Sequence, residues 1–562
     1  MSADSLPSFL VGGAAAALLS VLMPHPARKQ PIPQPTPPTP PLNIGILASA
    51  CYFPSTHITQ SALETHNNIP AGKYTLGLGQ ESMSITGDVE DVNSIALTAV
   101  SMLLDQYNID PMTVGRLEVG TETLIDKSKS TKTVLMSLFP GNSNIEGVTT
   151  VNACYGGTAA LLNAFLWCES SGWDGRFAIV VACDIANYAP GPARPTSGVG
   201  AVAFLVGRDA PLSFTPKLRA THAANTWDFY KPDHRVEHPV VDGALSQTCY
   251  YQALEGCYTL YCDKQDVVSS GANPGDSVLT PFTACTPKFF VFHAPYNKLV
   301  QKSYARLYFI DARRRFAKTG TVDPRDKRLA AWIDVPIEST YTDRGLDAVL
   351  KDLSKAKYEE QLKASNYASR LIGNTYAASV FVGLCSLIDA DVLSPGDNVT
   401  VFSYGSGSMA TMYNLTVTPT NSPFTLARQS VNLNLRERLA SRELVAPDEL
   451  DYALNCRARC HGSVAPYSPC YPTERLFKGT YYLAGIDEKW RRTYARVVDT
   501  HPGGGRLVPP ICLRHETNEQ HGVPVQGRLS ALARKDSSID VKISSVITGV
   551  AVGLPGDGKP PC

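Results

Sequence analysis

A single cysteine, set between a short β-branched run and two glycines, is the side chain best placed for chemistry. Cys154 follows Val148–Val151 and precedes Gly156 and Gly157, and the apolar residues from 158 to 168 have helical spacing. We therefore predict that Cys154 lies where a strand turns into a helix. The free N–H groups at a helix N-terminus stabilise a thiolate and lower the pKa of a cysteine there. This placement indicates either a nucleophilic thiolate or a buried structural thiol.

Two residues that can transfer protons also end predicted strands. Glu122 closes the segment 116–122, and His293 follows the apolar run Phe289–Phe292. In open α/β sheets, binding sites form at the carboxyl ends of strands, and an unperturbed imidazole titrates at about pH 6.5. Each residue alone also has a simpler interpretation, because such a glutamate often caps a helix and such a histidine is often a satisfied core residue.

Strand and helix patterns alternate along the chain and are expected to hold these residues on one sheet. In the first part, buried strands are predicted at 43–52, 177–182 and 198–206, with a helix at 91–105. Such alternation is typical of an α/β protein with parallel strands. Later, the apolar run before His293 and a strand predicted to end in the turn Tyr404–Ser408 repeat this arrangement. The sequence therefore predicts an α/β fold with two similar halves, although no sequence repeat is visible.

Charge and cysteine content limit the kinds of partner that this chain can have. The 562 residues include 51 Lys plus Arg and 51 Asp plus Glu, so the formal net charge is zero. Neither nucleic acid nor an anionic membrane is predicted as the main partner. The 14 cysteines lack regular spacing, which indicates free thiols in a reducing compartment and favours a cytoplasmic protein. No metal site is predicted, because Cys456, Cys460, His461 and Cys470 are poorly spaced for zinc.

The chain is predicted to have four parts. These are an apolar leader with a Pro-rich linker at 1–42, a first half at 43–210, a second half at 211–498, and a mobile tail at 499–562. The apolar stretch of the leader, 9–23, has no basic segment before it and is short for a membrane span, which needs about 20 residues. A frayed partial helix and a weak membrane anchor are the alternatives, and the second would make the protein membrane-associated.

Motifs spread from about residue 43 to residue 496 resemble those of the hydroxymethylglutaryl-CoA (HMG-CoA) synthase family of thiolase-like condensing enzymes. The motifs are GRLEVGTET, NACYGGTAAL, ARPTSGVGAVAFLVG, DFYKPD, FHAPYNKLVQKS, GNTYAAS, FSYGSGS and DEKWRRTYAR. The resemblance implies a five-layered αβαβα fold and a homodimer. It also implies condensation of acetyl-CoA with acetoacetyl-CoA and water to HMG-CoA and free CoA, a step toward mevalonate, isoprenoids and sterols. The CoA thioesters are substrates, and no cofactor is expected.

The resemblance further implies a role for each candidate residue. Cys154 is expected to be the nucleophile that takes the acetyl group, and Glu122 the base that removes a methyl proton. His293 is expected to bind and polarise acetoacetyl-CoA. The residues expected to bind substrate are Pro70, Ala71, Lys73, Thr196, Ser246, Lys298, Lys302, Asn374 and Ser406. Those expected to support the site are Asp184, Tyr188, Asp228 and Tyr376.

Two departures from the family pattern bear on substrate affinity. The family usually has asparagine and glycine where this chain has Pro192 and Cys183, although the three expected catalytic residue types are intact. Two alternatives are a related condensing enzyme with another acyl substrate, such as a carrier-protein thioester, and a weakly active paralogue that acts as a scaffold. Lys298 and Lys302 are spaced one helical turn apart and suit CoA phosphates, which favours CoA.

Overall fold

The computed structural model describes residues 43–270, 283, 286–461 and 465–498. The predicted leader at 1–42, with its apolar stretch, and the predicted tail at 499–562 lie outside these residues. Within the described ranges, no helix combines the length and the apolar character that crossing a membrane requires.

Nine strands form one large mixed sheet, and most of them have nearly continuous apolar sequences that fit burial on both faces. The strand order is β11–β12–β13–β8–β1–β7–β6–β4–β5, so β1 and β8 join two groups of strands. The first group contains β1 (Gly45–Tyr52), β7 (Gly198–Gly207), β6 (Phe177–Ala186), β4 (Val114–Gly120) and β5 (Thr149–Thr150). The second contains β8 (Leu212–Ala223), β13 (Met409–Val417), β12 (Asn398–Gly405) and β11 (Phe289–Phe292).

Helices and small strand pairs surround this sheet. The α-helices of the described residues are α1 (Gln60–His66), α2 (Val92–Tyr107), α3 (Thr131–Leu135), α4 (Gly156–Glu169), α5 (Gly243–Ser270), α6 (Asn297–Thr319), α7 (Arg344–Gln361), α8 (Tyr367–Ile372), α9 (Ser379–Asp389), α10 (Leu426–Leu433), α11 (Leu435–Ala440) and α12 (Asp448–His461). The 3-10 helices are η1 (Pro111–Thr113), η2 (Met136–Leu138), η3 (Arg194–Thr196), η4 (Pro324–Leu329), η5 (Ile337–Thr340) and η6 (Tyr376–Ala378). The smaller strands are β2 (Thr56–Thr59), β3 (Ser82–Ile85), β9 (Phe229–Tyr230), β10 (Val240–Val241), β14 (Glu443–Leu444), β15 (Tyr481–Ile486) and β16 (Arg492–Arg496).

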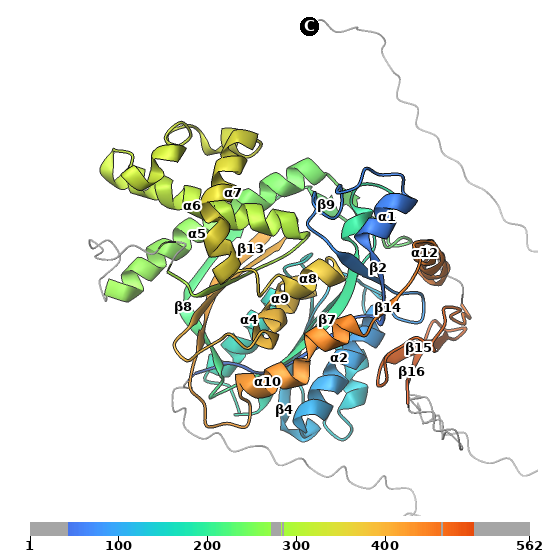
Figure 1. The fold of residues 1–562 in the computed structure, drawn as a ribbon. Coiled ribbons are helices and arrows are strands. Elements are labelled where there is room, and N and C mark those ends of the chain that lie inside the picture. The colour runs from blue at the N-terminus through green and yellow to red at the C-terminus, as the bar shows by residue number, and fades with distance from the viewer. Residues whose placement is uncertain (1–42, 271–282, 284–285, 462–464, 499–562) are drawn as a thin grey trace, which may run out of the picture. The chain divides into compact units, whose positions relative to one another are not determined.

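The strands separate three apolar cores, because successive side chains of a strand point to opposite faces. In β6, Val180 packs in a central core, whereas Ile179 and Val181 pack in an outer one. Helices α4 and α9 fill the central core between the two strand groups, as Figure 1 shows. Helix α2 covers the outer face of the first group, and α5 and α6 cover that of the second. This order of layers is αβαβα, which confirms the predicted thiolase-like fold.

The two strand groups repeat one pattern of strand directions. In the first, β4 is parallel to β6, β6 is antiparallel to β7, and β7 is antiparallel to β1. In the second, β11, β12, β13 and β8 follow the same sequence of directions. Glu122 follows the end of β4, and His293 follows the end of β11. The two candidate residues therefore stand at matching places in two similar halves.

The strand predicted in front of Cys154 is much shorter than the β-branched run suggested. Only Thr149–Thr150 forms a strand, β5, and it pairs with β4 alone at the edge of the sheet. The flanking Val148 and Val151 are 55% and 53% exposed. β-Branched residues favour extended structure, but the run has no second neighbouring strand that could extend the ladder. By contrast, α2 begins where predicted, because the Asp91 side chain accepts a hydrogen bond from the Ser94 N–H at 2.9 Å.

Candidate active site

Cys154 lies at the turn into α4, as the sequence predicted, and its side chain is buried against aromatic residues. Its cluster includes Tyr188 and Tyr376. Glycine is required two residues into this helix, because a Cβ on Gly157 would lie 2.5 Å from the carbonyl oxygen of Ala377. The close approach of α4 to η6 therefore sets the position of the cysteine.

The thiol of Cys154 faces the carboxylate of Glu122. Sγ donates a hydrogen bond to Glu122 Oε1 at 3.4 Å. Burial, followed by the charges of Glu122 and Asp184, raises the pKa of Cys154 well above its ordinary value, whereas Lys231 acts to lower it. The expected lowering of this pKa is therefore wrong. The sequence pattern indicated the helix N-terminus, but it could not show that two carboxylates lie beside the thiol. The thiol carries its proton in this state and directs it to the candidate base.

Asp184, in β6, fastens the end of β4 to η6. Its Oδ1 accepts hydrogen bonds from the N–H groups of Glu122 and Thr123, both at 2.9 Å, and from the hydroxyls of Thr121 and Thr123, both at 2.7 Å. Its Oδ2 accepts one from the N–H of Ala377 at 2.8 Å. Burial and the charge of Glu122 raise the pKa of Asp184 to about 7. This carboxyl group thus fixes the backbone on both sides of Cys154.

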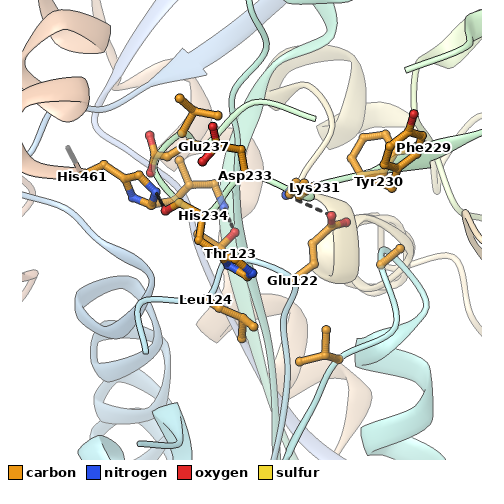
Figure 2. Close-up of a pocket in the computed structure, with 14 residues that line it drawn as sticks. Glu122, Thr123, Leu124, Phe229, Tyr230, Lys231, Asp233, His234, Glu237 and His461 are labelled. Atoms are coloured by element: carbon orange, nitrogen blue, oxygen red, sulfur yellow. Dashed lines mark hydrogen bonds and ion pairs between the residues drawn. The ribbon is translucent and has the colours of Figure 1, made fainter. Parts of the chain in front are cut away.

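Lys231 belongs to the site although the sequence analysis did not select it. Its Nζ lies 3.0 Å from Glu122 Oε2, and both residues line a pocket of about 330 Å³, shown in Figure 2. The ammonium also lies 4.5 Å from the ring centroid of Tyr376 and 5.6 Å from that of Phe229. The motif DFYKPD could have indicated this lysine, but the family resemblance assigned a role only to its first residue, Asp228.

His293 is buried and uncharged in this environment. Burial lowers the pKa of the imidazole to about 3. Its carbonyl oxygen accepts a hydrogen bond from Tyr250 Oη at 2.7 Å. Among the described residues, none hydrogen-bonds its buried Nδ1. The next residue, Ala294, exchanges hydrogen bonds of 3.1 Å with the side chain of Ser379 at the start of α9. The end of β11 is thereby tied to the segment that also carries Tyr376.

Asp228 holds the turn that contains Ser406. Its carboxylate accepts hydrogen bonds from Tyr404 Oη and from the Gly407 N–H, both at 3.0 Å. Burial acts to raise the pKa of Asp228, but the hydrogen bonds that its carboxylate accepts, above all the one from the hydroxyl of Ser406, lower the pKa overall. A Cβ on Gly405 would lie 2.5 Å from the backbone nitrogen of Tyr155, so this turn packs directly against the loop of the cysteine. The structure thus brings Asp228 and Ser406 to the site.

Four other predicted residues meet beside Cys154. The backbone N–H of Asn374 donates to the carbonyl of Thr196 at 2.9 Å, and the Asn374 side chain donates to Tyr188 Oη at 3.5 Å. Asn374 also accepts a hydrogen bond from the N–H of Tyr376 at 2.9 Å. Tyr188 and Tyr376 pack edge to face, with ring centroids 6.0 Å apart. These contacts link η3, η6 and the end of β6 around the thiol.

A second group of predicted residues lies on an exposed loop and on α6. Pro70, Ala71 and Lys73 are exposed, and the N–H of Lys298 donates to the carbonyl of Leu78 in the same loop at 2.8 Å. Lys302 forms an ion pair of 2.7 Å with Asp347. Burial, with the charges of Lys351 and Lys302, lowers the pKa of Lys298. Ser246 stands apart from this group, in the first turn of α5, where its N–H bonds Asp242.

Comparison with known proteins places the chain in a family. The family model described as hydroxymethylglutaryl-coenzyme A synthase N terminal matches residues 40–211, and the C-terminal model matches residues 212–497. The chain belongs to the HMG-CoA synthase family. It is 46% identical over 469 residues to the cytoplasmic hydroxymethylglutaryl-CoA synthase of Gallus gallus, across 81% of this chain and 87% of that protein. It is therefore an acyl-transferring condensing enzyme.

Solved structures of HMG synthases have the same fold. MvaS in complex with 3-hydroxy-3-methylglutaryl coenzyme A superposes with a TM-score of 0.67 at 30% identity, over 81% of this chain and 99% of that chain. The HMG synthase of the curacin biosynthetic pathway superposes with a TM-score of 0.64, over 81% of this chain and 100% of that chain. Its identity is 21%, so this second likeness concerns the fold alone.

The two departures from the HMG-CoA synthase pattern occupy different environments. Cys183 is fully buried in the outer core beneath α2, on the face of β6 away from Cys154. Pro192 is exposed in the loop before η3. Of the two departures, only Pro192 is therefore accessible from solvent.

Two of the four residues considered for zinc do converge. Cys456 and Cys470 have Sγ atoms 3.3 Å apart, next to Asp88. The Asp88 carboxylate already accepts bonds from Tyr467 Oη and from the backbone N–H groups of residues 470 and 471. Cys460 and His461 are outside this group. The carboxylate therefore has a structural role in anchoring the loop, and the prediction of no metal site is kept as a prediction.

Proposed function

We propose that this HMG-CoA synthase family member condenses acetyl-CoA with acetoacetyl-CoA and water, giving HMG-CoA and CoA through an acetyl-Cys154 intermediate. The observation that carries the proposal is the contact of 3.4 Å between the thiol of Cys154 and the carboxylate of Glu122. A nucleophile and a proton acceptor within hydrogen-bond reach form the unit that acyl transfer needs. The product would supply mevalonate synthesis in the cytoplasm.

In the first step, Cys154 Sγ attacks the thioester carbonyl of acetyl-CoA. The thiol gives its proton to Glu122, a new S–C bond forms, and the bond to the CoA sulfur breaks. CoA leaves with the proton returned by Glu122. Because the free thiol holds its proton strongly, a base in direct contact speeds this attack.

In the second step, Glu122 removes a proton from the methyl group of acetyl-Cys154. The electron pair of the broken C–H bond forms a C–C bond to the ketone carbon of acetoacetyl-CoA. The neutral imidazole of His293 donates a hydrogen bond to the ketone oxygen as negative charge develops there. Glu122 then gives the proton that it took to this oxygen, which becomes the hydroxyl of HMG-CoA. Backbone N–H groups near Cys154 and at the Ser406 turn would stabilise the enolate oxygen. Water then cleaves the thioester to Cys154, which releases HMG-CoA and restores the thiol.

The cations near the loop of Lys73 suit the phosphates of CoA. Lys298 lies beside Lys302 and Lys351, and the positive charge of these neighbours disfavours its own. A phosphate bound there would relieve this repulsion. Lys302 would then exchange its ion pair with Asp347 for one with the ligand. Thr196, Ser246 and Asn374 would contact other parts of the substrates.

A homodimer is also proposed, through the exposed edge of the sheet. Strand β5 ends the sheet, and Val148 and Val151 on either side of it are more than half exposed. Apolar side chains on an unpaired edge favour association with a second copy. This edge leads directly into the loop of Cys154, so a dimer formed here would also shield the site.

Steady-state assays with two donors test the proposed substrates. Wild type should form HMG-CoA from acetyl-CoA, and Lys298→Met should raise the KM for the CoA substrates about tenfold, as expected for the loss of one charged hydrogen bond. Lys363→Met, which removes an exposed lysine paired with Glu359, is the matched control and should leave KM unchanged. Turnover only with an acetyl carrier protein would favour the related condensing enzyme instead, and no turnover with either donor would favour the scaffold.

A further inference from the structure

The two oxygens of the Glu122 carboxylate have different partners. Oε2 lies 3.0 Å from Lys231 Nζ, whereas Oε1 accepts the hydrogen bond from Cys154 Sγ at 3.4 Å. The side chain of Glu122 is 5% exposed and that of Lys231 is 20% exposed. Figure 2 shows the side chains of Glu122 and Lys231 pointing toward one another in the lining of the pocket. The ion pair therefore turns one fixed oxygen toward the sulfur.

The ammonium of Lys231 is itself held in place by aromatic rings. It lies 4.5 Å from the ring centroid of Tyr376 and 5.6 Å from that of Phe229. Phe229 lies in β9, whose pairing with β10 fixes the backbone just before the lysine. Attraction between a cation and a ring face grows when water is excluded. The position of this positive charge is therefore built by the fold and is not a surface contact.

The charges around Glu122 require such a cation. Asp184 in β6, Cys154 before α4, Tyr188 after β6 and Tyr376 in η6 all lie close enough to interact with Glu122. Burial raises the pKa of the thiol and of both tyrosines, so these three keep their protons, and the carboxyl group of Asp184 is the acid whose charge opposes that of Glu122. Burial acts to lower the pKa of Lys231, but Glu122 and Asp184 outweigh it and raise that pKa, so the ammonium stays charged. Two buried carboxylates without a cation between them would compete for a proton.

We propose that Lys231 is a positioning residue of the condensation, whose ammonium holds one oxygen of Glu122 so that the other faces the sulfur that carries the acetyl group. The inference rests on the proposed roles of Cys154 and Glu122. In the condensation step, Glu122 takes the methyl proton while the electrons of that C–H bond form the new C–C bond. A glutamate that is turned away from the sulfur cannot accept this proton.

Three variants of the full chain test the inference: Lys231→Met, Lys231→Arg and the control Lys264→Met. Lys264 is a part-buried lysine of α5 whose Nζ donates to the carbonyl of Arg219 at 2.7 Å. The readouts are acetyl labelling of Cys154 by radiolabelled acetyl-CoA, exchange of the methyl protons of the acetyl-enzyme with D2O, and kcat.

Lys231→Met should still be acetylated at Cys154, while methyl exchange and kcat fall about 100-fold, the scale of general-base catalysis. Lys231→Arg should restore most of both effects, and Lys264→Met should match wild type.

Unchanged methyl exchange and an unchanged kcat in Lys231→Met would overturn the inference. Loss of acetylation together with a lower melting temperature, not restored by arginine, would assign the lysine a structural role and would also overturn it. Wild type that takes no label would remove the proposed function itself, which is a different outcome from a labelled wild type with an unaffected lysine variant.

Discussion

At the level of single residues, the site combines a protonated thiol with a carboxylate that is ready to receive its proton. Cys154 and Glu122 are in hydrogen-bond contact, and Lys231 and Asp184 hold the glutamate from its other side. Burial makes the thiol less acidic than a free cysteine, so its reactivity depends on the adjacent base. In the proposed mechanism, nucleophile and base therefore act as one unit.

Replacing the base should separate the two halves of the reaction. Glu122→Gln keeps the size of the side chain but cannot take the methyl proton, so condensation should fall by about 10²–10⁴-fold. Acetylation of Cys154 should persist at a reduced rate, because CoA thioesters still reach the sulfur. Product formation and bound label are measured in parallel, and a variant that condenses at the wild-type rate would exclude Glu122 as the base.

His293 should not titrate in the physiological range. Burial lowers its pKa to about 3. NMR of labelled histidine should therefore show His293 as the neutral imidazole throughout the range from pH 5 to 8. Since the folded-state pKa lies below the unfolded value of about 6.5, the stability that this residue contributes is fully present above pH 6.5 and is lost as pH falls toward 3. A chemical-shift midpoint near pH 6.5 would contradict this account.

At this scale, the sequence predicted the reactive types but not their mutual arrangement. Cys154, Glu122 and His293 could be selected because each ends a recognisable apolar run. Lys231 could not, because the strand before it has only two residues and gives no periodic signal for the direction of its side chain. The raised pKa of Cys154 was equally out of reach, since it arises from carboxylates that are distant in sequence.

At the level of elements, the site depends on the close packing of two helical starts. Helix α4 begins just after Cys154, and η6 and α9 begin just after Asn374. Both helices lie in the central core, where Gly157 meets the carbonyl of Ala377. A change in this packing should therefore disturb catalysis as well as stability.

Gly157→Ala should destabilise the protein although alanine favours helices. Its Cβ would lie 2.5 Å from a carbonyl oxygen and 2.8 Å from Ala182 Cβ, and overpacking of this kind costs about 1–3 kcal/mol. That cost exceeds the gain in helix propensity of up to about 1 kcal/mol. Gly243→Ala is the matched control, because nothing lies within 4 Å of its Cβ position. Thermal melting should show a lower midpoint for Gly157→Ala only, and equal midpoints would contradict the packing argument.

Most elements followed from local patterns, and the exceptions have a physical cause. The long apolar strands and the helix α2 lie close to their predicted ranges, because burial imposes a clear periodicity on them. The prediction of a longer strand at β5 was wrong, because the β-branched run before Cys154 lies at the edge of the sheet and its valines face solvent. Propensity alone cannot show whether a strand finds two neighbours.

At the level of the whole molecule, two similar halves place the proposed catalytic groups at matching strand ends. Glu122 follows β4 and His293 follows β11, while α4 and α9 share the central core. The proposed base and the proposed hydrogen-bond donor therefore come from separate halves of the chain. Family motifs allowed the fold to be predicted, whereas the local patterns alone indicated only an α/β protein.

Breaking the proposed dimer tests the exposed edge of the sheet. Val148→Asp adds a charge at a position that is 55% exposed, and we expect it to convert a dimer of the 60.6 kDa chain into a monomer. Val431→Asp, at 76% exposure in α10, is the control and should remain dimeric. Size-exclusion chromatography with light scattering gives both masses, and a monomeric wild type would contradict the dimer.

The central claim is that Cys154 carries the acetyl group for a carbon–carbon bond. The direct measurement is a single turnover of wild type, loaded with labelled acetyl-CoA, freed of excess donor and then mixed with acetoacetyl-CoA. Before mixing, mass spectrometry of peptides should find the acetyl group on Cys154, and Cys154→Ala should carry none. After mixing, the label should leave the protein and appear in HMG-CoA. An unlabelled Cys154, or a label that is released only as acetate, would contradict the account.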